Sequence, residues 1–293
     1  MTLIERLDIY EKLMRLDKPI GILLLLWPTL WGLWLSSEGM PDPTVVAVFV
    51  FGVVLMRSAG CIVNDFADRN LDSHVERTRN RPLAARIIPS WEALLLAGTL
   101  MLLAFLLVLQ LNHLTLELAV VALLLAVVYP FLKRFFWLPQ AWLGIAFGFG
   151  IPMAFAAHQN AIAPVAWVLM IANMFWAIAY DTEYAMVDRD DDVKLGLKSS
   201  AILFGRFDVH GVILCHALFL LMMAAAGWQM HLGLFYFAAL AVAAGLVCRQ
   251  FLLIRERQRD RCFRAFLNNG LVGAVIYGGI LLDFLLHLPL FSE

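Results

Sequence analysis

Long apolar stretches, separated by short polar connections, run through almost the whole chain. A helix that spans a membrane needs ~20 consecutive apolar residues, and a helix satisfies its own backbone hydrogen bonds in lipid. Nine stretches approach this length. They cover residues 19–36, 44–66, 90–110, 114–132, 139–157, 161–182, 208–228, 232–252 and 266–288. The pattern therefore predicts an all-α integral membrane protein with nine transmembrane helices.

Residues 1–18 show a different pattern. Leu3, Leu7, Tyr10 and Met14 recur at helical spacing between charged residues. Such a segment is typical of an amphipathic helix that lies on the membrane surface. A frayed terminus is the alternative interpretation.

The composition agrees with a membrane protein. Of the 293 residues, 62% are hydrophobic and 15% are charged, whereas soluble domains have about a quarter of charged residues. The mean hydropathy is +0.81. The four cysteines have no spacing typical of a zinc site or a disulfide framework. A soluble domain is excluded, and we expect no nucleic-acid partner.

The basic residues indicate the orientation. All but one of the 22 Lys and Arg residues lie in the N-terminal arm or in and beside the connections that follow the second, fourth, sixth and eighth predicted helices. The connections near residues 37–43, 111–113, 158–160 and 229–231 contain none. Because Lys and Arg mark the cytoplasmic side, we expect a cytoplasmic N-terminus and a periplasmic C-terminus.

A polar sequence at the end of the second predicted helix is the first candidate site. Asn64, Asp68 and Asp72 are spaced by four residues, which would place them on one face of a helix. Oxygen ligands of this kind suit hard cations such as Mg²⁺, and guanidinium groups suit phosphate. The complete group is Asn64, Asp65, Asp68 and Asp72, followed by Arg77, Arg79 and Arg81.

The remaining basic residue, Arg57, lies inside the second predicted helix. It shares a helical face with Asn64 and lies about 10 Å deeper along the axis. An intramembrane charge normally faces a polar cavity or a partner. The residue therefore predicts either a polar substrate cavity below the acidic group or an ion pair between helices.

A second acidic group follows the sixth predicted helix. Asp188 and Asp192 repeat the four-residue spacing, Asp181 falls on the same helical face, and Lys194 and Lys198 follow. Both acidic groups lie at the predicted cytoplasmic ends of helices. We interpret them as facing each other across one cavity mouth, where they would hold Mg²⁺ ions around a diphosphate. Solvated helix ends, or pairing with nearby arginines, is the alternative.

The chain resembles the UbiA family of intramembrane prenyltransferases at these residues. The family pattern NDxxDxxxD matches Asn64, Asp65, Asp68 and Asp72, and the pattern DxxxD matches Asp188 and Asp192. Other segments resemble those of one branch of this family, the branch that acts on 4-hydroxybenzoate in the ubiquinone pathway. Examples are LDKPIGILLLLWPTLW, ERTRNRPL and YPFLKR. The resemblance extends from about residue 10 to 285.

The resemblance implies a single membrane domain over residues 1–293, with an interfacial helix at 1–18 and a nine-helix bundle around a central cavity at 19–288. It implies Mg²⁺-dependent transfer of a polyprenyl group from polyprenyl diphosphate to 4-hydroxybenzoate, at the ring carbon ortho to the hydroxyl. It also implies a location in the bacterial inner membrane, with the active site facing the cytoplasm.

The resemblance assigns roles to particular residues. Asn64, Asp68, Asp72, Asp188 and Asp192 would hold Mg²⁺ and diphosphate, and the four aspartates would be catalytic. Arg134 would contact substrate or diphosphate, although its position alone favours a cytoplasmic membrane anchor.

Other residues are predicted to contact substrate. Arg57 is the candidate partner of the 4-hydroxybenzoate carboxylate. Asp181 could position the phenol, deprotonate the ring or act from behind another residue, and Asn173 could line the cavity or bond a neighbouring helix. Residues near the acidic groups complete the predicted substrate-binding set: Asp65, Arg77, Arg81, Lys194 and Lys198.

Two competing functions remain at this stage. The acidic patterns also fit a prenyltransferase with another acceptor, such as a naphthoate, homogentisate or haem. A cation-coupled transporter is the alternative from another class. Transporters usually place charged residues near the membrane midplane, whereas these acidic groups lie at one surface, which favours an enzyme.

Overall fold

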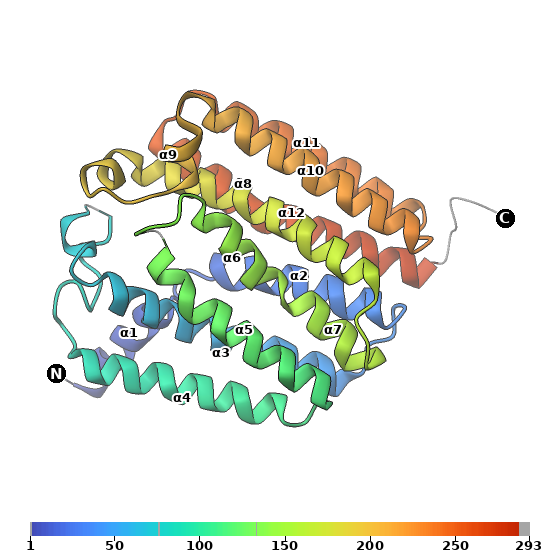
Figure 1. Cartoon of the computed structure of the whole chain (residues 1–293), viewed down its shortest axis with the longest axis horizontal. Coiled ribbons are helices and arrows are strands. Elements are labelled where there is room, and N and C mark those ends of the chain that lie inside the picture. The colour runs from blue at the N-terminus through green and yellow to red at the C-terminus, as the bar shows by residue number, and fades with distance from the viewer. Residues whose placement is uncertain (1, 76, 133, 287–293) are drawn as a thin grey trace.

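A computed structural model describes residues 2–75, 77–132 and 134–286, and these residues form an all-helical bundle without strands (Figure 1). Its elements are α1 (Leu3–Met14), α2 (Ile20–Ser36), α3 (Pro43–Asp68), the 3₁₀ turn η1 (Asp72–His74), α4 (Ser90–Val108), α5 (His113–Leu132), α6 (Pro139–Gly148), α7 (Gly150–Gln159), α8 (Pro164–Lys194), α9 (Ser200–Phe204), η2 (Gly205–Phe207), α10 (Asp208–Gln229), α11 (Leu234–Ile254) and α12 (Arg259–Leu286).

The long helices correspond to the predicted apolar stretches. Within the described residues, eight helical segments are long and apolar enough to cross a membrane. The first predicted stretch forms α2, which has 17 residues and contains Pro28. At 1.5 Å per residue this helix is about 26 Å long, slightly shorter than the ~30 Å hydrocarbon core. The prediction of an all-α, multi-pass membrane protein is therefore confirmed.

Three predicted stretches differ from the structure, and the last of them, 266–288, begins earlier, at Arg259. Residues 139–157 form two helices, α6 and α7, because Pro152 has no amide hydrogen to donate to the carbonyl of Gly148. The stretch 161–182 continues as one helix to Lys194. Its last turns stay helical because Ala185, Met186 and Val187 are buried against neighbouring elements.

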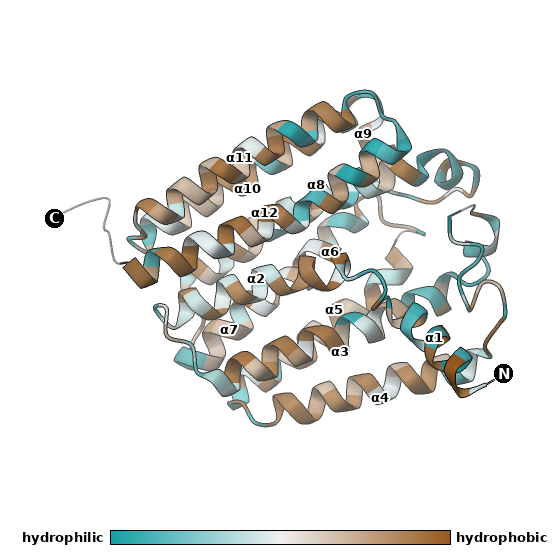
Figure 2. Cartoon of the chain, turned by 180° about the vertical axis from the view of Figure 1, so that it is seen from behind, coloured by the Kyte–Doolittle hydropathy of each residue, from teal (hydrophilic) through white to brown (hydrophobic). Residues whose placement is uncertain are grey.

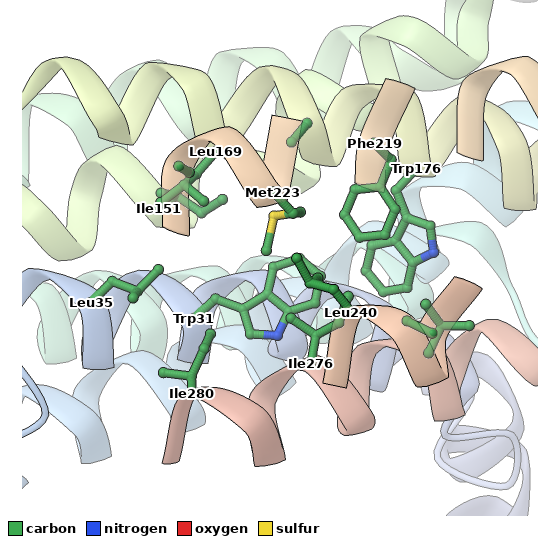
Figure 3. Packing of buried hydrophobic residues seen from close by; sticks show 14 of the residues in the cluster. Trp31, Leu35, Ile151, Leu169, Trp176, Phe219, Met223, Leu240, Ile276 and Ile280 are labelled. Carbon is green, nitrogen blue, oxygen red and sulfur yellow. The ribbon is translucent and has the colours of Figure 1, made fainter. Parts of the chain in front are cut away.

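Aromatic side chains join α8 to the centre of the bundle. Trp31 of α2, Trp176 of α8 and Phe219 of α10 lie against one another (Figure 3). The Trp31–Trp176 ring centroids are 5.2 Å apart, and the Trp176–Phe219 rings stack at 5.4 Å. Such pairs contribute about 0.5–1.5 kcal/mol beyond burial. This cluster holds α8 firmly against its neighbours.

Hydrophilic residues gather at the end of the bundle that carries α1, α9 and the connection between α3 and α4, whereas the middles of the helices are mostly hydrophobic (Figure 2). Helix α1 packs at this end through Ile9 and Leu13 and leaves Leu3 and Leu7 exposed. Its exposed leucines fit the predicted position on a membrane surface, which stays a prediction.

Candidate active site

One large cavity, of about 1320 Å³, extends from the hydrophilic end into the bundle. Both acidic groups line it at that end. Deeper in, side chains of α4 and α5 such as Phe105, Val108 and Leu123 make its wall apolar. Since Lys18 and Phe105 are both exposed and both line it, the cavity reaches the surface in its polar part and in its apolar part. This shape suits a molecule with a charged head and an apolar tail.

The first acidic group is built by the end of α3 and the turn that follows. Asn64 and Asp68 lie on α3 and line the cavity together with Arg57. The expectation that Asp72 extends this helical face is wrong, because α3 ends at Asp68 and Asp72 starts η1. Nevertheless Asp72 lines the same cavity.

A side chain explains where α3 ends. The Arg69 guanidinium donates to the Phe66 carbonyl at 2.6 Å, and the Leu71 amide donates to the Asp68 carbonyl at 2.8 Å. These bonds satisfy carbonyls that another helical turn would otherwise satisfy. The chain therefore leaves the helix and turns Asp72 back towards the cavity.

Three arginines neutralise the acidic groups, two of them in this part of the site. Arg81 Nη1 donates to Asp72 Oδ2 at 2.7 Å and to Asp65 Oδ1 at 3.1 Å. Arg15, at the end of α1, donates to both oxygens of Asp65 at 2.9 and 3.1 Å. The third arginine, Arg77, reaches across to the second acidic group.

Arg77 connects the two groups directly. Its Nε donates to Asp188 Oδ1 and Oδ2 at 3.0 and 3.1 Å, and its Nη2 also donates to Oδ2. The guanidinium lies over the Tyr184 ring, 4.6 Å from the centroid. Burial lowers the pKa of Arg77, but Tyr184 and Asp188 outweigh it and raise this pKa above its ordinary value. Arg77 therefore stays cationic.

The second acidic group lies on one continuous helix. Asp181, Asp188 and Asp192 of α8 all line the cavity. Polar contacts on other faces of α8 join it to its neighbours. Asn269 Nδ2 of α12 donates to Glu183 Oε2 at 2.8 Å, and Arg189 Nη1 donates to Asp208 Oδ2 at 3.0 Å.

Arg57 lies deeper in the cavity wall. Its Nη1 donates to Cys61 Sγ at 2.7 Å, and its guanidinium carbon lies 5.6 Å from the Phe147 ring centroid. A Cβ on Gly21 would lie 2.5 Å from Arg57 Nη2, so this glycine gives the guanidinium its space. Within the described part of the chain, Arg57 Nε has no hydrogen-bond partner and no carboxylate forms an ion pair with Arg57. The alternative of an interhelical ion pair is not supported.

Three predicted site residues do not line the cavity. Asn173 is fully buried and its Nδ2 donates to the Gly144 carbonyl at 3.0 Å, so it joins α8 to α6. Of the two alternatives for Asn173, the structure therefore shows the bond to a neighbouring helix, and the prediction that Asn173 lines the cavity and binds substrate is corrected. Lys194 is exposed, with its Nζ 3.7 Å from Asp191. Arg134 donates to the Ala67 carbonyl at 2.8 Å, next to the end of α3.

Lys198, by contrast, lines the cavity. Its Nζ donates to the Phe135 carbonyl at 2.9 Å and lies 4.3 Å from the Trp137 ring centroid. Lys198 therefore adds a positive charge to the lining of the cavity that also contains the second acidic group.

Several cavity residues were missed from the sequence. Arg15 looked like part of a surface helix, and only the packing of α1 on α3 brings it to Asp65. Tyr129 and Tyr180 also line the cavity, and the Tyr180 hydroxyl has no hydrogen-bond partner among the described residues. Five of the six tyrosines of the chain lie in the long apolar helices, so hydropathy alone carries no signal for these two.

The donor set fits metal ions that are shared with a substrate. Within the described ranges, no three His, Cys, Asp or Glu side chains lie together closely enough to hold an ion by themselves. Mg²⁺ usually binds one or two carboxylates and completes its octahedron with water and phosphate oxygens. Two separated carboxylate pairs on one cavity suit this kind of coordination.

Comparisons with known proteins identify the family of the chain. Residues 25–272 match the model of the UbiA prenyltransferase family. The chain is 63% identical over 286 residues to the 4-hydroxybenzoate octaprenyltransferase of Nitrosomonas eutropha, covering 98% of this chain and 100% of the relative. It is 63% identical over 287 residues to the protein of the same name from Nitrosospira multiformis, covering 98% and 99%. The chain therefore belongs to the UbiA prenyltransferase family.

Solved structures share the fold. The apo structure of a UbiA homolog from Aeropyrum pernix K1 has a TM-score of 0.80 at 25% identity and covers 89% of this chain and 97% of its own. A UbiA homolog from Archaeoglobus fulgidus, bound to GPP and Mg²⁺, has a TM-score of 0.66 at 18% identity, covering 93% and 99%. At 18% identity the likeness concerns the fold alone.

Proposed function

We propose that this protein transfers a polyprenyl group from polyprenyl diphosphate to 4-hydroxybenzoate, as a Mg²⁺-dependent step of ubiquinone biosynthesis. One observation carries the reaction type: two acidic pairs and their arginines line the polar part of a cavity whose deeper wall is apolar. The acceptor is supported by the names of near-full-length relatives at 63% identity.

The diphosphate head lies between the two acidic groups. Asn64, Asp68, Asp72, Asp188 and Asp192 would hold Mg²⁺, which when bound neutralises the charge that develops on the departing diphosphate. Arg77 and Arg81 supply guanidinium donors at the same place. The prenyl chain lies against the apolar wall, where it stays out of water.

The remaining cavity residues act on the aromatic acid. Arg57 binds its carboxylate through the part of the guanidinium that faces the cavity. The allylic C–O bond breaks and diphosphate leaves with the electron pair. The ring carbon ortho to the hydroxyl then forms the new C–C bond and releases its proton, which restores aromaticity. Asp181, on the same side of α8 as Asp188, is the candidate that positions the phenol or accepts this proton.

Three further basic residues have supporting roles in this proposal. Arg134 holds the end of α3 beside Asp68 through the Ala67 carbonyl. Lys194 and Lys198 add positive charge after Asp192, where a diphosphate approaches from water.

The chain forms one membrane domain with nine spanning helices. Helix α2, which packs against α3, α7 and α12, would be the ninth beside the eight segments that are long enough to span (Figure 1). Since the basic connections gather at the end that carries the acidic groups, the N-terminus and the active site face the cytoplasm of a bacterium and the C-terminus faces the periplasm.

The acceptor is tested with membranes that contain the overproduced protein. They are given a polyprenyl diphosphate and either 4-hydroxybenzoate, a dihydroxynaphthoate or homogentisate, with Mg²⁺ or with EDTA. Prenylated 4-hydroxybenzoate should form only with Mg²⁺ and well above the other products. A preference for another acceptor, or product formation in EDTA, would contradict the proposal.

A further inference from the structure

The carboxylates proposed to hold metal already bind arginines. Both oxygens of Asp188 accept from Arg77, and Asp72 Oδ2 accepts from Arg81. The Arg81 side chain is 15% exposed, and that of Arg77 is partly exposed, at 32%. Each aspartate is therefore paired with a guanidinium group whose charge water screens only partly.

A divalent ion at these carboxylates would conflict with the arginines. It would compete for the same oxygens and lie within a few ångströms of a guanidinium, which is a strong like-charge repulsion in a partly buried site. An arginine displaced without a new partner would leave a buried charge unpaired, which is costly. Metal alone is therefore a poor ligand for this site.

Diphosphate removes the conflict. Its oxygens match the forked donors of arginine at least as well as a carboxylate does. When diphosphate enters with the metal, each guanidinium can turn from the carboxylate to a phosphate oxygen, and the carboxylate becomes free for the metal. Every charge then keeps a partner of opposite sign.

We propose that Arg77 and Arg81 exchange carboxylate for diphosphate on binding, so that divalent metal and diphosphate bind this protein with positive cooperativity. This inference rests on the proposed function, because it takes diphosphate and metal as ligands of the cavity.

The two arginines differ in their role. Arg81 is also bonded to Asp65, which Arg15 shares, whereas Asp188 is the one carboxylate that Arg77 contacts in the described residues. Arg77 therefore makes the larger movement.

The test measures metal binding directly, independently of catalysis. Mn²⁺ replaces Mg²⁺ as the probe, and its binding to the full-length purified protein is followed by electron paramagnetic resonance with and without inorganic diphosphate. Protein-free titrations account for the Mn²⁺–diphosphate complex that forms in solution. In the native protein, diphosphate should tighten Mn²⁺ binding by at least about tenfold, in the range of typical coupling between sites.

The decisive variant is Arg77→Gln, with Arg255→Gln as the matched control, because Arg255 is exposed and pairs with Glu256 outside the cavity. Arg77→Gln frees Asp188, so Mn²⁺ alone should bind several-fold tighter than in the native protein, while labelled diphosphate binds more weakly. Arg255→Gln should change neither. A purely structural role of Arg77 would weaken both ligands.

Mn²⁺ binding that is unchanged or weaker in Arg77→Gln would overturn the inference. If that variant does not fold, Arg81→Gln provides the same readout with a smaller expected change. Independent binding of Mn²⁺ and diphosphate in the native protein would refute the exchange and leave the proposed function standing. Failure of both ligands to bind under any condition would refute the proposed function itself.

Discussion

The two acidic groups have the same chemistry on different supports. The first is assembled from the end of α3, the turn η1 and a connection held by Arg15 and Arg81. The second lies entirely on α8, a helix of 31 residues whose other side is buried. Ion pairs therefore position the first group, whereas helix packing positions the second.

The buried side of α8 shows how the second group is held. Asn269 Oδ1 accepts from Trp176 Nε1 at 2.9 Å, and its Nδ2 donates to Glu183. Near the same level, the Thr182 and Ser200 hydroxyls lie 2.6 Å apart. These contacts fix the rotation of α8 about its axis, and with it the direction of Asp181 and Asp188.

The largest effect should come from removing one carboxylate charge in either group. Asp72→Asn and Asp192→Asn should each lower kcat/KM about 10³-fold, comparable to the loss of a main electrostatic contact to the leaving group. Asp190→Asn is the control, since the Asp190 side chain is 76% exposed and does not line the cavity. Near-native activity in one of the two variants would mean that its group has no part in diphosphate binding.

Replacing Arg57, in the inner part of the cavity that both acidic groups line, should have a smaller effect on catalysis than removing a carboxylate. Charge-assisted hydrogen bonds contribute about 1.5–3 kcal/mol, so Arg57→Met should raise KM for 4-hydroxybenzoate roughly 10- to 100-fold. KM for the polyprenyl diphosphate should change little. Steady-state kinetics with each substrate varied in turn distinguishes these results, and an unchanged KM for the acid would exclude Arg57 as its partner.

Replacing Glu183 tests the packed support of the second group. Glu183→Leu removes an acceptor from the buried Asn269 amide and should lower stability by about 1–3 kcal/mol. Glu183→Gln keeps an oxygen acceptor and should lose less. Thermal unfolding in detergent measures the difference, with the exposed Glu117→Gln as control. Equal Tm values for the Leu variant and the native protein would show that this contact does not support α8.

The smallest effect should come from the ionic support of the first group. Asp65 accepts hydrogen bonds from Arg15 and Arg81, and we expect it to position these arginines and not to bind the metal itself. Asp65→Asn should therefore raise KM for polyprenyl diphosphate only a few-fold, because Asp65 acts on the diphosphate through Arg15 and Arg81 and not by direct contact. A loss as large as that of Asp72→Asn would instead make Asp65 a metal ligand.

The sequence predicted most of the helices and both acidic groups, because long apolar runs and regular aspartate spacing are visible in one dimension. It failed where the outcome depends on tertiary contacts. Arg57 and Asn173 are both polar residues in apolar helices, yet one lines the cavity and the other bonds Gly144. Sequence spacing shows on which face of a helix a residue lies, but it does not show which neighbouring element packs against that face. Asp72 left the predicted helix because Arg69 ends it, and Arg15 reached the site only through packing of α1.

The central claim is that the two acidic groups form one diphosphate site. It is tested most directly by prenylated 4-hydroxybenzoate formation in Asp68→Asn, Asp188→Asn and the double variant, measured at saturating Mg²⁺. Because residues that act as a unit are strongly non-additive, each single variant should lose about 10³-fold in kcat/KM and the double variant little more. Full multiplication of the two losses, or near-native activity in either single variant, would contradict a shared site.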